Sequence, residues 1–348
     1  MVQCGHCKAE TKGKRCVCGK VSYCGENCQR MDWARHKSSC PLYVVREVPG
    51  KGRGTFATRK ISPGRVIMEE LPLLTWTGTF SEWIESAFRI RTDTEIESKI
   101  LSLKDPLDSP SVEGNLVYPM IHLAGLTGDD QMSKVTRIAF FNNVRLPSNS
   151  KETGLYHQIS LINHSCNPNA VWTWVKDDVR RKQVRAIKTI RKNEEICTDY
   201  LSGKMFSMGL RKDRIEQIVK LANFICRCTE CSLQGEALEE NENARREYLD
   251  IKKDLPQLGY TNKKLAFRKS QRMVDIVRKL DLEINLYEVL LNCHHFALMA
   301  RQSGASGIEN PETSREEAWK RCQHFGEAGI STFREAVTQI QIQCLLSQ

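Results

Sequence analysis

The chain has 348 residues, of which 40% are hydrophobic and 27% charged, values that are ordinary for folded globular proteins and argue against wholesale disorder. This length exceeds one average domain, so two or three folded units are expected. The sequence begins without an export signal and has no stretch near the roughly 20 apolar residues of a membrane span. We therefore expect an intracellular protein, cytoplasmic or nuclear, with no membrane partner.

The formal net charge of +10 arises entirely from the first 65 residues, which contain fourteen Lys and Arg but only four Asp and Glu. If the cysteines there bind zinc as thiolates, seven thiolates and two Zn²⁺ lower this local charge to about +7. The remaining basic patch is compatible with weak nucleic-acid binding or with an acidic protein tail, and equally with a solubilising surface.

The first forty residues hold seven of the fifteen cysteines and too few large apolar side chains to build a core. In a reducing compartment, metal binding by thiolates is expected rather than disulfides. A short helix over residues 26–36 would place Cys28 and His36 on different turns, so they should serve different ions. The pattern predicts two closed, structural zinc sites. Their ligands are Cys4, Cys7, Cys24 and Cys28 at one site and Cys16, Cys18, His36 and Cys40 at the other.

After residue 41 the sequence alternates between strand and helix signals. Strands and turns are predicted up to about residue 72, with an apolar run at 42–48 and a turn followed by a strand at 61–68. Apolar residues at roughly helical spacing then predict helices within 79–103, followed by a loop at 105–115. Later strands are predicted at 155–162, 169–175, 183–190 and 195–201, with Lys176-Asp-Asp as the hairpin turn and a basic flank at 180–182.

Beyond residue 234 the pattern becomes helical, with an apolar face from Met273 to Phe296 and a loop at 303–313 before a last helix. We therefore expect an α+β protein of small β-sheets with a helical insertion and a helical C-terminal region. The expected divisions are a zinc module at 1–40, a β-rich domain at 41–201 with its insertion at about 79–150, a second cysteine segment at 202–234, and the helical region at 235–348.

Four further motifs carry chemistry. The alternating glycines of Pro49-Gly-Lys-Gly-Arg-Gly54 permit close backbone approach to a ligand, but they form no P-loop because no Ser or Thr opens a helix after them. Residues 159–169 are predicted to be an apolar strand that runs into a polar turn holding Asn163, His164 and Cys166. A short strand then ends at Tyr200, and a second cysteine cluster follows at Cys226, Cys228 and Cys231.

In this order the motifs resemble a SET domain, and the first forty residues resemble a MYND zinc finger, with Tyr23, Gln29 and Trp33 beside the ligands. By this resemblance, over about residues 1–231, the chain is identified as a member of the SET and MYND domain (SMYD) family of protein-lysine methyltransferases. Its finger precedes the whole SET domain, whereas many members carry the finger inside it. The second knuckle is Cys-x-Cys instead of Cys-x2-Cys, and the helical tail is short.

The resemblance implies an enzyme that binds S-adenosylmethionine and methylates a lysine of a histone or another protein. It implies Tyr200 as the catalytic residue, with its hydroxyl directed at the methyl group and the amine. Cys166 would complete a third structural zinc site with Cys226, Cys228 and Cys231. The implied cofactor contacts are Lys51, Gly52, Arg53, Asn142, Asn163, His164, Tyr200 and Phe224, with Phe224 beneath the adenine.

Two departures from the family pattern bear on activity. Asn193 replaces a glycine before Glu-Glu, but asparagine tolerates the left-handed backbone of such a turn. Ala222 stands where members often carry an aromatic residue near the cofactor. Ala222 and the short tail favour an alternative, a non-catalytic transcriptional corepressor or scaffold whose finger binds Pro-rich peptides. The intact Asn163, His164 and Tyr200 favour the enzyme.

Overall fold

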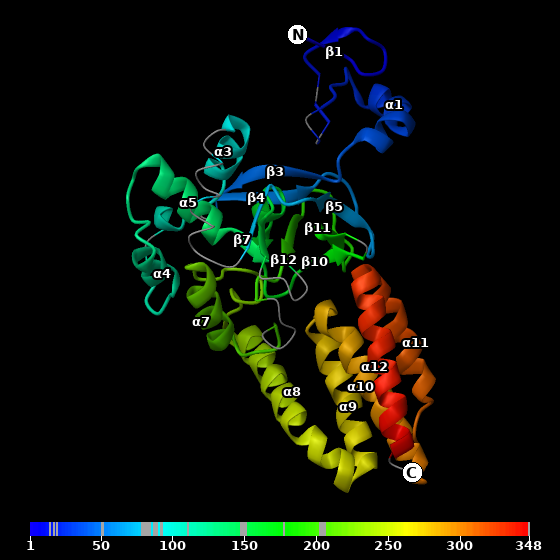
Figure 1. The fold of residues 1–348 in the computed structure, drawn as a ribbon. Helices are drawn as coiled ribbons and strands as arrows, with labels where there is room; N and C mark the ends of the chain where they lie inside the picture. The colour runs from blue at the N-terminus through cyan, green and yellow to red at the C-terminus, as the bar shows by residue number, and fades with distance from the viewer. Residues whose placement is uncertain are drawn as a thin grey trace.

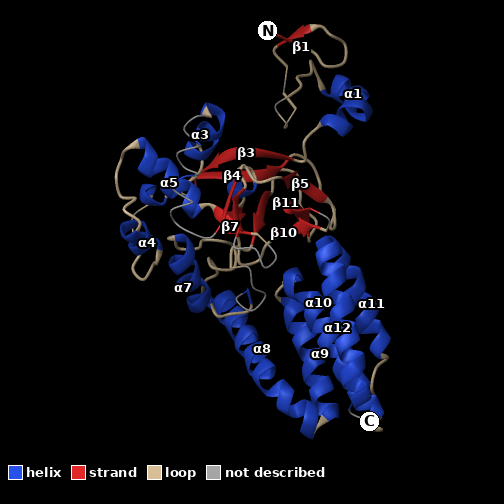
Figure 2. Cartoon of the chain, in the orientation of Figure 1, coloured by secondary structure: helices blue, strands red, loops and turns tan. Residues whose placement is uncertain are grey.

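The computed structural model describes residues 1–13, 15, 16, 18, 20–49, 52–77, 85, 90, 93–109, 111–146, 152–176, 178–201 and 207–346. Three regions follow one another along the chain: a small N-terminal module, a β-rich centre with helices at one side, and a helical C-terminal region (Figure 1). Figure 2 shows that the strands that follow the N-terminal module gather in the centre and that the C-terminal region is built from helices. This is the α+β architecture that the sequence predicted.

The N-terminal module contains little regular structure. Strands β1 (Val2–Gln3) and β2 (Glu10–Thr11) form an antiparallel pair, and helix α1 (Glu26–Ser39) extends three residues beyond its predicted end. The Tyr23 hydroxyl donates to buried Asp32 on this helix at 2.7 Å. Otherwise the interior of the module consists mainly of cysteines, as expected for a unit too small for an apolar core.

Three small sheets make up the β-rich centre in the described part of the chain. The first has the order β3 (Tyr43–Val48), β4 (Gly52–Ala57), β12 (Glu195–Thr198) and β9 (Asn163–His164), and its β12–β9 pair is parallel. The second has the order β10 (Ala170–Val175), β11 (Asp178–Ala186) and β5 (Val66–Glu70). The third has the order β6 (Leu74–Thr77), β8 (Glu152–Leu155) and β7 (Asn143–Arg145).

The strand predicted at 155–162 was wrong beyond its first residue. Strand β8 ends at Leu155, and Ile159–Leu161 forms a 3₁₀ turn before β9 begins. The physical reason is the Glu70 carboxylate, which accepts the backbone N–H groups of Gln158 and Ile159 at 3.0 Å. Those donors are thereby withdrawn from any strand ladder, so the chain turns.

Two other strands also differ from the prediction in their boundaries. Strand β11 runs from Asp178 to Ala186 instead of from 183 to 190, so the basic residues at 180–182 lie within the strand and not in a flank. Strand β12 ends at Thr198 instead of residue 201, because the Tyr200 backbone N–H donates to the His164 imidazole at 3.1 Å and leaves the ladder. Tyr200 therefore stands just past the strand end.

The helical insertion contains α3 (Thr94–Leu101), a 3₁₀ turn (Pro106–Asp108), α4 (Val117–Leu123) and α5 (Gln131–Phe141). Residues 79–84, 86–89, 91 and 92 of the predicted helical stretch lie outside the described residues. Asp93 caps α3 by accepting from the backbone of Glu95 and Ile96. Buried apolar residues such as Ile100 and Ile138 join α3 and α5 into a separate hydrophobic cluster beside the third sheet.

The C-terminal region consists of helices joined by short connections, among them the predicted loop, which spans residues 303–310. Helix α7 (Arg211–Ala222) and the 27-residue α8 (Gly235–Thr261) lead from the centre into it. Four helices then pack side by side: α9 (Lys263–Lys279), α10 (Glu283–Gln302), α11 (Pro311–Cys322) and α12 (Gly326–Leu346) (Figure 1). The predicted apolar face at 273–296 is split between α9 and α10 by a turn in which Asp281 has a φ of 51°. In the part that the structure describes, no helix is both long and apolar enough to cross a bilayer.

Candidate functional site

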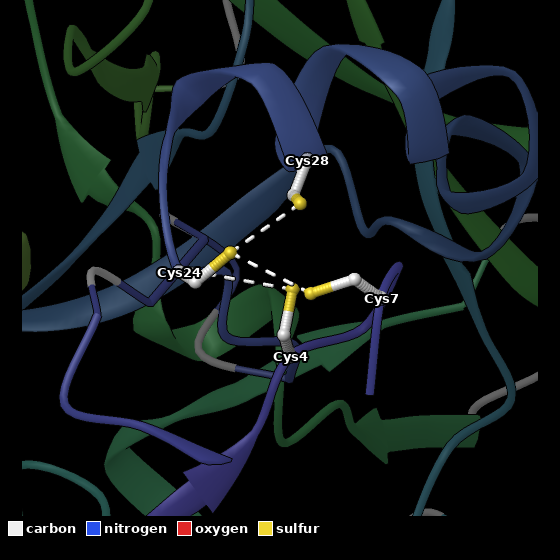
Figure 3. Close-up of side chains that lie close together, drawn as sticks. All are labelled: Cys4, Cys7, Cys24 and Cys28. Atoms are coloured by element: carbon white, nitrogen blue, oxygen red, sulfur yellow. Dashed lines mark hydrogen bonds between the residues drawn. The ribbon is translucent and has the colours of Figure 1, made fainter. Parts of the chain in front are cut away.

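Four thiols of the N-terminal module converge on one point, as Figure 3 shows. Cys28 comes from α1, Cys24 from just before it, and the other two from the loop after β1. The Cys24 sulfur lies 3.3 Å from that of Cys28 and 3.6 Å from that of Cys7. Zinc bonded to sulfur at about 2.3 Å spaces its tetrahedral ligands at about 3.8 Å, close to these separations. The donor set Cys4, Cys7, Cys24 and Cys28 therefore fits a zinc ion.

The second group in the module is formed by Cys16, Cys18, His36 and Cys40, all buried. His36 Nε2 lies 3.4 Å from each of the Cys16 and Cys18 sulfurs. Helix α1 contributes Cys28 to the first group and His36 to the second because the two side chains project from different turns. The structure thus brings together the same two interleaved groups that the sequence predicted.

A third group lies in the centre of the chain, where Cys166, Cys226, Cys228 and Cys231 are all buried. Cys166 follows β9, and the other three follow α7. The Cys166 sulfur is 3.5 Å from that of Cys231 and 3.9 Å from that of Cys226. No disulfide joins these cysteines. Four thiols at tetrahedral spacing suit zinc, which would bind them as thiolates.

Next to this third group, three chain segments meet in the first sheet. Strand β12 pairs with β4 on one side and with Asn163–His164 on the other. The Asn163 amide nitrogen donates to the Arg53 carbonyl oxygen at 3.0 Å and to Glu195 Oε1 at 2.7 Å. These bonds orient Asn163 so that its amide oxygen remains as an acceptor for a ligand. Gly52 and Arg53 begin β4 and therefore lie beside Asn163.

Gly54 makes this close strand approach sterically feasible. A Cβ atom there would lie 2.7 Å from Glu195 Oε1 and 3.0 Å from the Asn163 amide nitrogen. Both distances are shorter than ordinary van der Waals contact, so a side chain at Gly54 would displace the Glu195 and Asn163 side chains and disturb the hydrogen bond between them. Gly54 thus leaves room for the arrangement that orients Asn163.

Three aromatic rings surround the end of β12. The His164 ring lies 5.4 Å from that of Tyr200, and the Phe224 ring lies 6.4 Å from Tyr200 and perpendicular to it. The Tyr200 hydroxyl donates to the Ile162 carbonyl oxygen at 2.6 Å, although the residue is 38% exposed. Desolvation of the phenol raises the pKa of Tyr200, so its hydroxyl keeps its proton at neutral pH.

His164 occupies the space between Tyr200 and the third cysteine group. Its Nδ1 accepts the Tyr200 backbone N–H at 3.1 Å, and its Nε2 lies 3.4 Å from the Cys166 sulfur. Burial lowers the pKa of His164 to about 4, which keeps the imidazole neutral and able to accept that hydrogen bond. The imidazole therefore connects the tyrosine backbone to the metal-ligand cluster.

Asn142 and Phe224 each stand at the end of a helix. Asn142 directly follows α5 of the insertion, and Phe224 lies two residues after the end of α7. The Asn142 amide nitrogen donates to the Lys104 carbonyl oxygen at 3.0 Å, and the Lys104 ammonium lies 5.6 Å from the Phe224 ring centroid. Ala222 is buried at the end of α7. Lys51, the remaining predicted cofactor residue, lies outside the described residues.

Sequence reasoning missed three charged residues that contact the site or the residues around it. Lys104 lies near the Phe224 ring, Glu70 accepts from the backbone of the turn before β9, and Arg214 donates to the Cys231 sulfur. Lys104 and Glu70 belong to no motif, so nothing in the sequence marks them. Arg214 carries a weak signal, since it stands four residues before buried Ile218 on α7. A charged residue on the apolar face of a helix can be recognised as a candidate for a buried role.

Two family models match this chain, the MYND finger over residues 4–40 and the SET domain over residues 52–201. The chain therefore combines a MYND finger with a SET domain. This SET and MYND protein is 26% identical over 246 residues to the N-lysine methyltransferase SMYD2-B of Danio rerio, covering 67% of this chain and 51% of the relative. It is also 26% identical over 250 residues to the histone-lysine N-methyltransferase ASHR1 of Arabidopsis thaliana, covering 70% and 48%.

The SET and MYND chain spans about half the length of the curated relatives it matches. Among solved structures, the SET domain of LSMT bound to lysine and AdoHcy aligns over 91% of both chains at 10% identity, with a TM-score of 0.36. The Neurospora SET domain protein DIM-5, a histone lysine methyltransferase, aligns over 46% of this chain and 52% of its own at 20% identity, with a TM-score of 0.23.

Proposed function

We propose that this SET and MYND protein is an S-adenosylmethionine-dependent protein-lysine N-methyltransferase that acts on a histone or another protein. The observation that carries the proposal is the convergence of β4, Asn163, His164, Tyr200 and Phe224 at one edge of the first sheet. The curated relatives, which are named as lysine methyltransferases, support the same reaction.

The cofactor would supply an electrophilic methyl group on a sulfonium. We propose that Asn163 accepts from the cofactor amine through its amide oxygen and that the Phe224 ring supports the adenine. The first residues of β4 would contribute backbone groups at close approach. The full proposed set is Lys51, Gly52, Arg53, Asn142, Asn163, His164, Tyr200 and Phe224.

Methyl transfer to an amine is an in-line displacement, so the protein has to align and desolvate the two reactants. We assign the alignment to Tyr200. Its hydroxyl proton is engaged by the Ile162 carbonyl, which fixes the ring and leaves the phenolic oxygen as an acceptor for an N–H of the incoming lysine. The lysine would have to lose its proton to solvent first, which desolvation beside the positive sulfonium favours. The neutral amine held in this way would present its lone pair to the methyl group, and the cofactor would leave as S-adenosylhomocysteine.

Three structural zinc ions complete the proposal, one at each cysteine group. The third would hold the segment after α7 and thereby position Phe224, which precedes Cys226 by two residues. The two ions of the finger would replace the missing apolar core of residues 1–40. We propose the finger as a protein-binding module, with Pro-rich peptides as its partners.

The deciding experiment measures methyl transfer from labelled S-adenosylmethionine to proteins of a cell extract and to a peptide array. Tyr200→Phe should reduce the transfer rate about a hundredfold or more, because it removes the oxygen that orients the amine. Calorimetric binding of S-adenosylhomocysteine should change little in this variant. Equal background transfer by both proteins, despite cofactor binding, would favour the non-catalytic scaffold.

A further inference from the structure

Two buried arginines lie beside the third cysteine group. Arg214 on α7 is 1% exposed, and Arg245 on α8 is 0% exposed. Both donate to the Gly209 carbonyl oxygen, Arg214 at 2.5 Å and Arg245 at 3.4 Å, so their guanidinium groups are adjacent. A guanidinium keeps its proton even in the interior, since its pKa is above about 12. Each arginine therefore needs a negative partner to offset its desolvation.

Arg245 has such a partner in the Glu230 carboxylate, at 2.9 Å. For Arg214, no carboxylate of the described residues lies within ion-pair distance. Its Nη2 instead donates to the Cys231 sulfur at 3.9 Å. The negative charge that faces Arg214 is therefore that of the cysteine group.

The charge of a metal-loaded group makes this contact favourable. Four thiolates around one Zn²⁺ carry a net charge of about −2, and this group is buried. We propose that Arg214 is a positioning residue of the third zinc site: it donates to the Cys231 thiolate, offsets part of the buried negative charge and so retains the metal. The inference rests on the zinc that is proposed above for this group.

The contact also connects the metal site to the proposed cofactor wall. Phe224 packs against the same buried cluster as the four cysteines and Ile218 of α7. Glu230 stands between Cys228 and Cys231 in sequence and is held by both Arg245 and Asn241 of α8. Retention of zinc by Arg214 would thus hold Phe224 in place just after α7. Helix α8 would hold the same cysteine segment through Glu230.

The test uses the full-length chain, a zinc chelator in increasing concentration and N-ethylmaleimide, with alkylation of each cysteine measured by peptide mass spectrometry. Arg214→Met keeps the length and packing of the side chain but removes its charge and donors. In this variant, the third group should become alkylated at a chelator concentration about tenfold lower than in the wild type. Arg214→Lys, which keeps the charge, should fall between them. Lys212→Met, an exposed change on the same helix, should behave as the wild type.

Cys293 and Cys322 serve as internal controls, because both are buried in the C-terminal helices and belong to none of the three groups. They should stay protected in every variant, and the cysteines of the finger should react at the same chelator concentration in the variants as in the wild type. Wild-type protection of the third group in Arg214→Met would overturn the inference. It would also be overturned if Cys293 and Cys322 reacted together with the third group in both Arg214 variants.

The zinc proposal itself can fail independently of Arg214. In that case, chelator would not change the alkylation of the third group in the wild-type protein, and metal analysis would return two zinc ions per chain. Methyl transfer is measured separately with Tyr200→Phe, so loss of the enzymatic proposal would leave the alkylation result unaffected.

Discussion

Asn193 illustrates how much a single residue type can predict. It stands where the family usually has glycine, and its φ of 66° lies in the left-handed region that asparagine tolerates. Arg46 supports it by donating to the Asn193 side-chain oxygen at 3.1 Å. The turn into β12 therefore survives the replacement, as the sequence predicted, and β12 still reaches the site.

Lys182, by contrast, has a role that only its surroundings disclose. It is 1% exposed on β11, and its ammonium lies 3.4 Å from the Trp172 ring centroid, with Trp174 and Tyr156 at 5.4 and 5.5 Å. Its partner across the strands is Glu70. Burial lowers the pKa of Lys182 to about 7, although the three rings favour the charged form.

This lowered pKa predicts a pH-dependent stability. Between pH 7 and about 10.4 the unfolded chain binds more protons at Lys182 than the folded protein, so the free energy of unfolding should rise with pH. Lys182→Met removes the buried ammonium and should stabilise the zinc-loaded protein by a few kcal/mol at pH 7 and by less at pH 9.5. Urea denaturation at both values measures the difference. An advantage that stays constant or grows with pH would contradict the prediction, and exposed Lys212→Met is the control.

At the scale of elements, the loop after α3 depends on one buried ion pair. Arg137 of α5 contacts Asp105 through two nitrogens, at 2.7 and 2.6 Å, and both side chains are buried. Arg137 also donates to the Gly128 carbonyl oxygen at 2.7 Å. The pair fixes the segment whose Lys104 carbonyl is held by Asn142, and so it connects the insertion to the site.

Asp105→Ala should therefore destabilise the protein by about 3–5 kcal/mol, because Arg137 would remain charged and buried without a partner. Chemical denaturation with fluorescence detection measures the loss. The comparison is Lys99→Ala, which breaks the exposed pair with Glu95 and should change stability little. Similar effects of the two substitutions would show that the Asp105–Arg137 pair does not support the insertion.

At the scale of the whole molecule, three metal groups lie in two regions of the chain. Native mass spectrometry of the protein should show three zinc ions per chain. Cys18→Ser and Cys228→Ser should each reduce the count to two, because each removes a ligand from a different closed site. Cys293→Ser, at a buried cysteine outside the groups, should retain all three. Two ions in the wild type would show that one group does not hold metal.

The two candidate ligand groups of the first forty residues could be predicted from the sequence because their chelating pairs are close in the chain, whereas Cys166 was assigned to the third group only through the family resemblance, since it lies 60 residues before Cys226. The α+β class and the order of the motifs were likewise accessible, since strand, turn and helix signals are local. The 3₁₀ turn at Ile159–Leu161 was not, because the carboxylate that causes it belongs to Glu70, far away in sequence.

The tertiary structure alone decided which charged residues are buried and what they face. Three contacts form only after distant elements have packed together. They are the ion pair of Asp105 with Arg137, the contact of the Lys182 ammonium with aromatic rings, and the hydrogen bond from Arg214 to the Cys231 sulfur. No local pattern encodes such contacts, since a charged side chain looks the same in sequence whether it faces water or the interior. The sequence by itself determined the order of the motifs and the candidate metal-ligand pairs that are close in the chain; packing decided which partners surround them, because burial is a property of the assembled fold.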